Sequence, residues 1–486
     1  MSPVRGRVVA LACALAAVIA PSAADARRSF EMSAEPDLFP AFSTGTHDYV
    51  VRCDPDTPVR LSLAARDGAK VAVGDQSRRS GSFDRKLHLK PGRAVSLVAS
   101  SGGRERAYNV RCLPPDFPDF DVERRAAPQA HYYVVTPGLK TRAPGYAAVF
   151  DDRGAPVWWM RDDPAPFNAT LMPTGGIAWT QLTGPPRYQS LGHYDGYALD
   201  GSPIRQFSAE GILTDLHELR VAADGHAWVI AYAPRYHLDF RRWGGPRDAG
   251  VLDGEIQELD ERGKRVWTWS TRGHVGLGET SPWLHRLLFE QPAITFPGGR
   301  VYDTVHMNSV EPFGSRLVFS LRHTDAVYEI DRRTGRVAWK LGGVRTKRSL
   351  EIVGDPVSPS FDGQHDARFA GDRNSLTVYD NGILHKRPPR AVEYRIDRKK
   401  RTATFVNAVS FPEADRSTCC GSARRLPRGN WVVSWGNTPW VTEQTEEGDP
   451  VLTLGFPGRT SYRAEPVTGG QLTRRALRAG MDAMAP

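Results

Sequence analysis

The sequence predicts an all-β protein, a six-bladed β-propeller preceded by a small N-terminal β-sandwich domain. Three observations lead to this prediction. A hairpin pattern recurs six times after residue 131, two matching segments before residue 116 each end in cysteine, and the 486 residues include 46 glycines and 37 prolines without a low-complexity stretch. A chain of this length can bury more than one core. We expect domains at 27–115 and 132–486, joined by a linker at 116–131 and preceded by a signal peptide at 1–26.

The first 26 residues have the pattern of a signal peptide. Arg5 and Arg7 precede a small and apolar run at 8–20, and Ala24-Asp25-Ala26 offers a small-residue cleavage site. The run is too short to span a bilayer, and no later window is long and uncharged enough to do so. The arginine pair is not a twin-arginine signal, and Cys13 lies inside the run with too little of the run before it to favour a lipoprotein. We therefore expect an exported protein, periplasmic or extracellular, with no membrane span.

The formal net charge of +9 is spread singly and in short clusters along the chain. Such a distribution favours a solvated basic surface over a nucleic-acid interface. We expect no nucleic-acid partner.

Four cysteines follow the signal peptide. Cys53 and Cys112 end the matching segments Tyr49-Val-Val-Arg-Cys53 and Tyr108-Asn-Val-Arg-Cys112, so we expect them to pair in an oxidising compartment. Closing a loop of that length stabilises a fold by about 4 kcal/mol on the chain-entropy model. Cys419 and Cys420 are adjacent, and a vicinal disulfide is favoured over two oxidation-prone thiols.

Alternating runs separated by glycine and aspartate turns predict the strands of the N-terminal sandwich. These runs lie at 59–63, 86–89 and 94–98, and Pro114, Pro115 and Pro118 mark the start of the linker.

The recurring hairpin pattern is an apolar strand, a turn that contains aspartate, and a second strand with valine or tryptophan. Each copy predicts the two outer strands of one blade, whose apolar face only neighbouring blades can cover. We expect the last strand, near 461–467, to pair with an early segment. The copies lie at 150–158, 199–204, 259–267, 330–339, 396–403 and 444–451.

A second repeat lies between the hairpins and indicates a site. A polar or small residue is followed eight positions later by a turn residue, and the pairs are Asn168 with Gly176, His217 with Gly225, His306 with Gly314, His365 with Arg373, and Gly421 with Gly429. Propellers place the start of each inner strand beside the central channel, so the three histidines are expected to share one pocket.

Two other interpretations of the histidines stay open: structural hydrogen bonding and a three-histidine metal site. Glu218 and Asp366 adjoin two of the histidines, but neighbouring residues on a strand point to opposite faces, so these carboxylates are not expected as ligands. We expect no metal.

Five further segments, taken in order, resemble the arylsulfate sulfotransferases. They are 303–310, Ser320-Leu-Arg322 followed by Ile330-Asp331, 339–343, 364–368 and 379–382, and the similarity runs from about residue 132 to the end of the chain. Residues 331–339 also resemble the tryptophan-docking motif of the repeat-containing quinoproteins, but only one of the expected blades carries that motif clearly.

This resemblance implies an enzyme that moves a sulfuryl group from a phenolic sulfate ester to a phenolic acceptor without a nucleotide donor or other cofactor. The sequence has no glycine-rich loop with lysine for phosphates. By motif match, His365 is the nucleophile that carries the sulfuryl group. His217, His306 and Arg322 are the groups that bind sulfate oxygens and stabilise charge. Asn308, Asn168 and Asn437 are the candidates for substrate binding.

Two alternative functions remain at the level of sequence. One is a non-catalytic exported propeller that binds an anionic or carbohydrate ligand, and the other is a quinoprotein-like oxidoreductase. Trp158, Trp159, Trp435 and Trp440 are aromatic candidates for stacking on a phenol, although packing between blades is the favoured interpretation.

Overall fold

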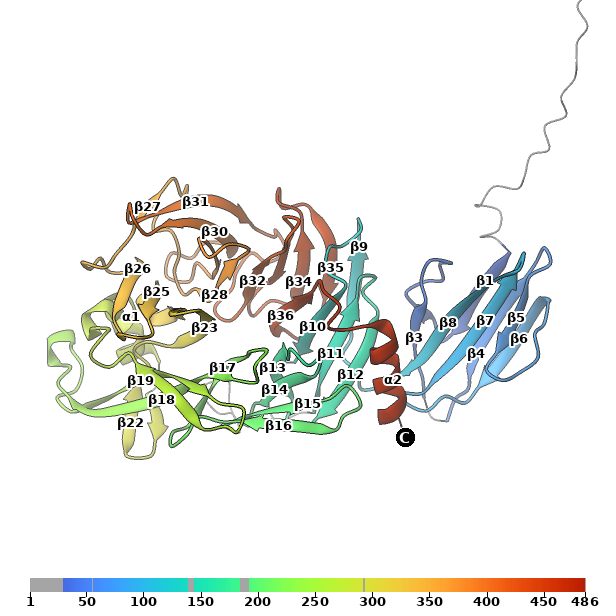
Figure 1. Ribbon diagram of the computed structural model, residues 1–486, viewed down its shortest axis with the longest axis horizontal. Helices are drawn as coiled ribbons and strands as arrows, with labels where there is room; N and C mark the ends of the chain where they lie inside the picture. The colour runs from blue at the N-terminus through green and yellow to red at the C-terminus, as the bar shows by residue number, and fades with distance from the viewer. Residues whose placement is uncertain (1–28, 55, 139–143, 184–191, 292, 486) are drawn as a thin grey trace, which may run out of the picture.

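The computed structural model describes residues 29–54, 56–138, 144–183, 192–291 and 293–485 (Figure 1). The predicted signal peptide at 1–26 lies outside the described residues. The described chain is mostly β and consists of small sheets whose strands are largely antiparallel, as the sequence predicts. None of its helices is long and apolar enough to cross a membrane.

Two sheets form the N-terminal part of the chain and face each other across one apolar core. Strand β4 lies between β1 and β6 in one sheet, and the other has the order β2-β3-β8-β7-β5. The strands are β1 (Phe30–Glu35), β2 (Leu38–Phe39), β3 (Asp48–Arg52), β4 (Val59–Ala65), β5 (Lys70–Val73), β6 (Gly81–Leu87), β7 (Ala94–Ser101) and β8 (Arg104–Leu113).

The matching cysteine segments become neighbouring strands. β3 runs parallel to β8 with Val51 opposite Cys112, and the structure joins Cys53 to Cys112, whose Cα atoms lie 5.6 Å apart. The strand predicted at 86–89 is the end of β6, which begins earlier, at Gly81, and stops at Leu87.

Six further sheets follow, which we call ring sheets 1 to 6 (Figure 1). Each contains a four-stranded antiparallel meander. In ring sheet 1, three strands are consecutive in the sequence and the other one, which forms the inner edge, comes from near the end of the chain. Ring sheet 1 comprises β10 (Tyr132–Pro137), β11 (Gly145–Asp151), β12 (Pro156–Asp162) and β36 (Ser461–Val467), and ring sheet 2 comprises β13 (Pro166–Leu171), β14 (Ile177–Gln181), β15 (Tyr194–Tyr197) and β16 (Pro203–Phe207). Ring sheet 3 comprises β17 (Thr214–Val221), β18 (Ala227–Leu238), β19 (Ala249–Leu259) and β20 (Arg265–Ser270), and ring sheet 4 comprises β23 (Met307–Phe313), β24 (Arg316–Leu321), β25 (Ala326–Asp331) and β26 (Val337–Gly342). Ring sheet 5 comprises β28 (His365–Ala370), β29 (Ser375–Asp380), β30 (Arg390–Asp397) and β31 (Thr402–Val409), and ring sheet 6 comprises β32 (Ser422–Arg425), β33 (Trp431–Ser434), β34 (Trp440–Gln444) and β35 (Pro450–Gly455).

All six predicted hairpins are present as the outer strands of the ring sheets. The recurring aspartate has a local cause, because its carboxylate accepts a hydrogen bond from the amide two residues further on and so closes the turn. This bond is found at Asp151, Asp200, Asp260, Asp331 and Asp397.

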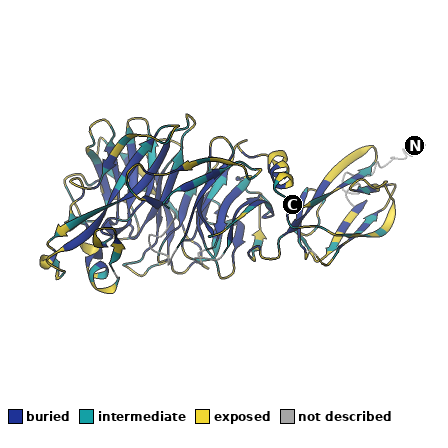
Figure 2. Ribbon diagram, turned by 90° about the horizontal axis from the view of Figure 1, so that it is seen from below, coloured by how far each residue is buried: buried dark blue, intermediate teal, exposed yellow. Residues whose placement is uncertain are grey.

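The ring closes where the sequence predicts it. β36 pairs antiparallel with β10, with Val467 opposite Tyr132. The first strands of the meanders, β36, β13, β17, β23, β28 and β32, contact one another in that order and return to β36; we call them the inner strands. Apolar clusters lie between neighbouring ring sheets all the way round, so most strands are buried on both faces (Figure 2). Each fully buried side chain of the size of leucine contributes about 1.5–3 kcal/mol.

Additional segments attach to this ring. β9 (Asp121–Arg124), which lies in the predicted linker, pairs with β35 and extends ring sheet 6. Ring sheet 3 carries an insertion, and ring sheet 5 gains β27 (Glu351–Val353). The remaining elements are η2 (Arg241–Trp243), η3 (Leu277–Thr280), α1 (Ser281–His285), η4 (Arg286–Glu290), β21 (Ile294–Phe296), β22 (Gly299–Tyr302), η5 (Arg322–Thr324) and α2 (Arg474–Met484).

Helix α2 lies between the ring and the N-terminal sheets (Figure 1). Its Leu477 and Met481 are buried in the cluster of ring sheet 1. On the other side, Arg478 donates to the carboxylate of Asp48 at 2.6 Å and to the carbonyl of His47 at 2.9 Å. The helix therefore ties the two parts of the chain together.

Candidate functional site

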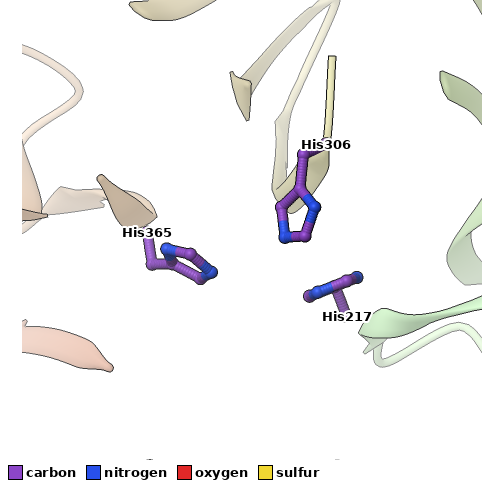
Figure 3. Close-up of side chains that lie close together, drawn as sticks. All are labelled: His217, His306 and His365. Carbon is purple, nitrogen blue, oxygen red and sulfur yellow. The ribbon is translucent and has the colours of Figure 1, made fainter. Parts of the chain in front are cut away.

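Three histidines from different inner strands meet in the ring. His217 lies in β17, His306 directly precedes β23, and His365 begins β28. Their ring centroids are 4.7 Å apart for His217 and His306, 5.9 Å for His306 and His365, and 6.4 Å for His217 and His365. Figure 3 shows the three rings pointing toward one another.

Irregular backbone at the start of the inner strands explains this convergence. Pairing of β17 with β18, β23 with β24, and β28 with β29 shifts register close to each histidine. His306 has a φ of 49° and Asp366 a φ of 58°, in the left-handed region that bulky residues seldom adopt. Such bulges re-aim side chains and are common beside functional sites.

The contacts of His365 favour one ring nitrogen as the reactive one. Its Nδ1 lies 3.2 Å from the carbonyl oxygen of Gly363, which can only accept, and 3.4 Å from the amide nitrogen of Asn381, which can only donate. The shorter contact assigns the proton to Nδ1. Nε2 then keeps its lone pair. His365 is 1% exposed, and its pKa is held well below the usual range by burial and then by the charges of His306 and Arg322. The imidazole is therefore neutral and nucleophilic at neutral pH.

The other two histidines are each paired with an aspartate. Nδ1 of His217 lies 2.6 Å from the Asp215 carboxylate, and Nδ1 of His306 lies 2.5 Å from that of Asp303. Burial lowers the pKa of His306 against the opposing charge of Asp303. A carboxylate at Nδ1 stabilises the imidazolium that forms when Nε2 takes up a proton, as an acid–base catalyst requires.

Arg322 is held by partners on three sides. One guanidinium nitrogen donates to Nε2 of His323, another donates to the carbonyl of Thr418 at 3.0 Å, and the group lies 4.6 Å from the ring of Trp283. His323 in turn donates from Nδ1 to the carbonyl of Asp303 at 2.5 Å. Burial and the charge of Arg322 hold the pKa of His323 well below its usual range, so His323 stays a neutral acceptor.

These groups line a pocket of about 400 Å³. Histidines and arginine occupy part of its wall, apolar and aromatic side chains another part, and the Cys419–Cys420 disulfide a third. The lining residues are Phe167, Leu182, Leu216, His217, Gln291, His306, Arg322, His323, His365, Thr418, Cys419, Cys420, Asn437 and Tyr462.

Asn437 lines the pocket, whereas Asn308 and Asn168 do not. The side chain of Asn308 is fully buried, donates to the carbonyl of Gln364 at 2.9 Å and accepts from the amide of Asp366 at 3.2 Å. It ties β23 to β28, and it lies outside the lining of the pocket. Asn168 donates to Tyr194 at 3.1 Å and to the carbonyl of Leu216 at 3.2 Å, and it is absent from the pocket lining.

The carboxylates next to the histidines point away from the pocket, as expected. Glu218 pairs with Arg368 at 2.5 Å and with Arg463 at 3.0 Å, and Asp366 pairs with Arg424 and Arg463. These charges are buried, and the cationic partners hold the pKa values of both carboxyl groups below the usual range against the cost of burial. The network crosslinks the inner strands beneath the histidines.

Sequence reasoning missed several lining residues. Tyr462 lies on β36, the inner strand that comes from the end of the chain, so it falls outside the eight-residue spacing that singled out the histidines. Its equivalence to the histidines could have been found from the predicted closing strand. His323, next to Arg322 in the sequence, had no repeat to mark it. Outside the lining, sequence reasoning also missed Trp283, which packs against Arg322 from α1, in the insertion between β20 and β21. The four tryptophans considered as stacking candidates, Trp158, Trp159, Trp435 and Trp440, are absent from the lining and lie in cores between sheets.

The three histidines could also be considered as metal ligands, since one nitrogen of each lies within 4.8 Å of the others. The charge beside them argues for a different ligand. The guanidinium of Arg322 lowers the pKa of both His306 and His365, and a dication would meet the same repulsion. An oxyanion would instead be attracted. In the second group, Asp303, His306 and His323, both ring nitrogens of His323 already have partners.

Comparison with known families gives one match. The family model described as Arylsulfotransferase (ASST) matches residues 196–457, more than half of the chain. That span includes all three histidines, Arg322, His323 and Asn437. No protein with a curated description matches the chain.

Among solved structures, the chain is similar to a protein of unknown function from Bacteroides caccae, with 12% identity and a TM-score of 0.43 over 70% of this chain and 99% of that one. It is also similar to the periplasmic gluconolactonase of Pseudomonas aeruginosa, with 13% identity and a TM-score of 0.39 over 69% of this chain and 99% of that one. Streptogramin B lyase has 11% identity and a TM-score of 0.33 over 88% of this chain and 97% of its own. Similarity at this level says nothing about activity.

Proposed function

The chain belongs to the arylsulfotransferase (ASST) family, and from this we propose that it moves a sulfuryl group from a phenolic sulfate ester to a phenolic acceptor through an N-sulfo adduct on His365. The observation that carries the mechanism is the state of His365. Its Nδ1 proton is committed to the carbonyl of Gly363, its imidazole is neutral, and it shares a pocket with Arg322 and two histidines paired with aspartates.

In the first half-reaction, the lone pair on Nε2 of His365 attacks the sulfur of the aryl sulfate. A nitrogen–sulfur bond forms while the ester oxygen–sulfur bond breaks, and the electron pair leaves with the phenoxide. His217 supplies a proton to this oxygen, supported by Asp215. Arg322 stabilises the sulfuryl oxygens with its planar donors, which a low-dielectric site makes more effective.

In the second half-reaction, a phenol takes the place of the departed one. The same histidine, now neutral, removes the phenolic proton, the oxygen attacks the sulfur, and the nitrogen–sulfur bond breaks to restore His365. Because donor and acceptor use the site in turn, one pocket of about 400 Å³ serves both.

The pocket also has a place for the aryl group. Phe167 and Tyr462 lie with ring centroids 4.5 Å apart, and Leu182 and Leu216 line the same pocket. Apolar and aromatic walls beside a cluster of polar groups are typical of sites that bind small organic molecules.

We further propose that the ring is a six-bladed β-propeller and that the N-terminal sheets form a separate β-sandwich domain. Six meanders with inner strands in closed order support the first assignment, and two facing sheets with their own core support the second. Since β9 joins ring sheet 6, the propeller extends into the segment expected as a linker.

Export is proposed from the sequence of residues 1–26 together with the two disulfides, which form and persist in oxidising compartments. Amino-terminal sequencing of the protein recovered from a periplasmic or culture fraction should begin at about residue 27. Recovery of the chain with Met1 intact in the cytosolic fraction would contradict export.

The test of mechanism is to trap the intermediate. Enzyme that is quenched during turnover of 4-nitrophenyl sulfate should carry one additional sulfuryl group, acid-labile and located by peptide mass spectrometry on His365. His365→Ala should lose both the adduct and transfer to phenol.

An adduct on His217 or His306 would overturn the assignment of the nucleophile but not the sulfotransferase activity. If the wild-type protein released no phenol from any aryl sulfate, a binding role for the pocket would become the better explanation.

A further inference from the structure

A second pocket, of about 340 Å³, opens beside the catalytic one. It lies among η4, the loop after β29 and the loop before β32. We call it the basic annex and define it by Arg286, Lys386, Arg387, Arg416 and Thr418. Among its lining side chains, four are cationic, and Glu290 is the one carboxylate.

The cations of the annex fall into two kinds. Arg387 pairs with Asp380 and Asp362, and Arg286 pairs with Glu290 at 3.2 Å, so internal partners offset their charge. Lys386 and Arg416 are exposed and have no ion-pair partner among the described residues. These two therefore supply the uncompensated positive charge.

The annex adjoins the catalytic pocket. Thr418 lines both of them, and its carbonyl accepts the hydrogen bond from Arg322. Arg286 and Arg322 lie over the same indole ring, that of Trp283, at 5.5 Å and 4.6 Å from its centroid. The two guanidinium groups can therefore be no further apart than the sum of these distances.

Hydrogen bonds also connect the annex to the residues that hold His365 in place. Ser417, which lines the annex, donates to the side-chain oxygen of Asn381, and Asn381 donates to the carbonyl of Gly363 at 2.8 Å. That carbonyl is the acceptor for Nδ1 of His365. Hydrogen bonds through Ser417, Asn381 and Gly363 therefore link the annex to the nucleophile.

We propose that the basic annex binds a second anionic group, a carboxylate or sulfonate, on the aromatic substrate. This inference rests on the proposed function, because it places the phenol of that substrate at His365. Charge complementarity favours an anion over a neutral sugar. The enclosed volume, close to that of the catalytic pocket, suits a small substituent rather than a macromolecule. Since donor and acceptor use one site, the preference applies to both.

The experiment compares two ligands of nearly equal size, 3-(4-hydroxyphenyl)propanoate and its primary amide. Equilibrium binding to the full chain is measured by calorimetry, and transfer from 4-nitrophenyl sulfate is measured with each as acceptor. We expect the carboxylate to bind the wild-type protein about ten- to a hundredfold more tightly than the amide, the range for a hydrogen bond to a charged group. The acceptor kcat/KM should show the same preference.

The variant Lys386→Gln with Arg416→Gln should abolish this preference and leave binding and transfer of the amide within about twofold of wild type. Arg416→Glu alone, at an exposed position, should lower the affinity for the carboxylate as well, because it reverses a charge of the annex. The matched control is Lys399→Gln with Lys400→Gln, which removes the same charge from an exposed turn of ring sheet 5 and should keep the full preference.

Equal binding of carboxylate and amide to the wild-type protein would overturn the inference and leave the sulfotransferase proposal intact. If the control variant also lost its preference for the carboxylate over the amide, the inference would be overturned. The net positive charge of the protein would then explain the preference without a specific site. Failure of all aryl sulfates to react would refute the proposed function, while the binding comparison would still decide whether the annex recognises an anion.

Discussion

The reactivity of the site depends on how three similar side chains are made different. His365 donates its Nδ1 proton to a neutral carbonyl, whereas His217 and His306 donate theirs to carboxylates. A carboxylate partner favours the protonated imidazole, and a carbonyl near other cations does not. The result is one neutral nucleophile beside two imidazoles whose Nδ1 atoms are held by carboxylates.

The lowered pKa of His365 predicts how the rate of the first half-reaction falls at low pH. Its imidazole must be neutral to attack, so activity is present above its pKa and is lost as the pH falls through it. Burial and neighbouring charges place that pKa well below the ordinary value of about 6.5, so release of phenol should persist below pH 6.5.

The measurement is the single-turnover release of 4-nitrophenol from 4-nitrophenyl sulfate as a function of pH. Because 4-nitrophenoxide leaves readily without a proton, the general acid contributes little and the profile reports the protonation state of His365. An acid limb centred at or above pH 6.5 would show that the imidazole is not desolvated as the structure indicates.

At the scale of elements, the start of an inner strand does two things. It contacts the neighbouring inner strand, and it positions a side chain beside the pocket. Left-handed residues at Asn168, His306 and Asp366 break the alternation of the strand. One side chain then enters the pocket while its neighbour joins the adjacent strand. Asn308 is the clearest example, because its amide serves two backbone groups of the segment that carries His365.

Asn308→Ala should therefore act through structure rather than through the transition state alone. It leaves the carbonyl of Gln364 and the amide of Asp366 without these partners in a buried site, and each such group costs about 1–3 kcal/mol. We expect a loss of about 2–5 kcal/mol in the free energy of unfolding, measured with a chemical denaturant, together with a lower yield of the His365 adduct.

The comparison variant is Asn437→Ala, which lines the pocket and should affect the kinetics of transfer more than stability. If Asn308→Ala kept wild-type stability and lost only turnover, a substrate-binding role for Asn308 would be restored.

At the scale of the whole molecule, the ring depends on a strand from the end of the chain. β36 pairs with β10, and Tyr462 on β36 lines the pocket, so closure and site formation are coupled. Helix α2 follows β36 and covers the outside of ring sheet 1 while contacting the N-terminal sheets. An unpaired strand edge is a site of aggregation, which closed rings avoid.

Deletion of residues 461–486 should therefore open the ring, expose the edge of β10 and give aggregated, inactive protein. Deletion of residues 474–486 removes α2 alone and should leave a soluble monomer or oligomer that still forms the adduct, with a lower melting temperature. Size-exclusion chromatography and the adduct assay distinguish the two. Soluble and active protein from the longer deletion would show that closure by β36 is dispensable.

Much of the architecture follows from the sequence because each blade is encoded locally. The aspartate closes the turn in five of the six outer hairpins, and the fixed spacing between inner strand and turn puts His217, His306 and His365 at equivalent positions. The matching cysteine segments likewise identify two neighbouring strands, although the register sets Val51, and not Cys53, opposite Cys112.

What only the tertiary structure decided concerns groups whose role depends on partners far away in the sequence. Trp283 supports Arg322 from an insertion, Tyr462 reaches the pocket from the closing strand, and the annex forms where residues at 286–290, 382–387 and 416–418 meet. The turn of Asn308 away from the pocket follows from bulges that no spacing reveals. The proton positions on the three imidazoles, and the neutrality of His365, come from burial and from acceptors that only the closed ring brings into contact with them.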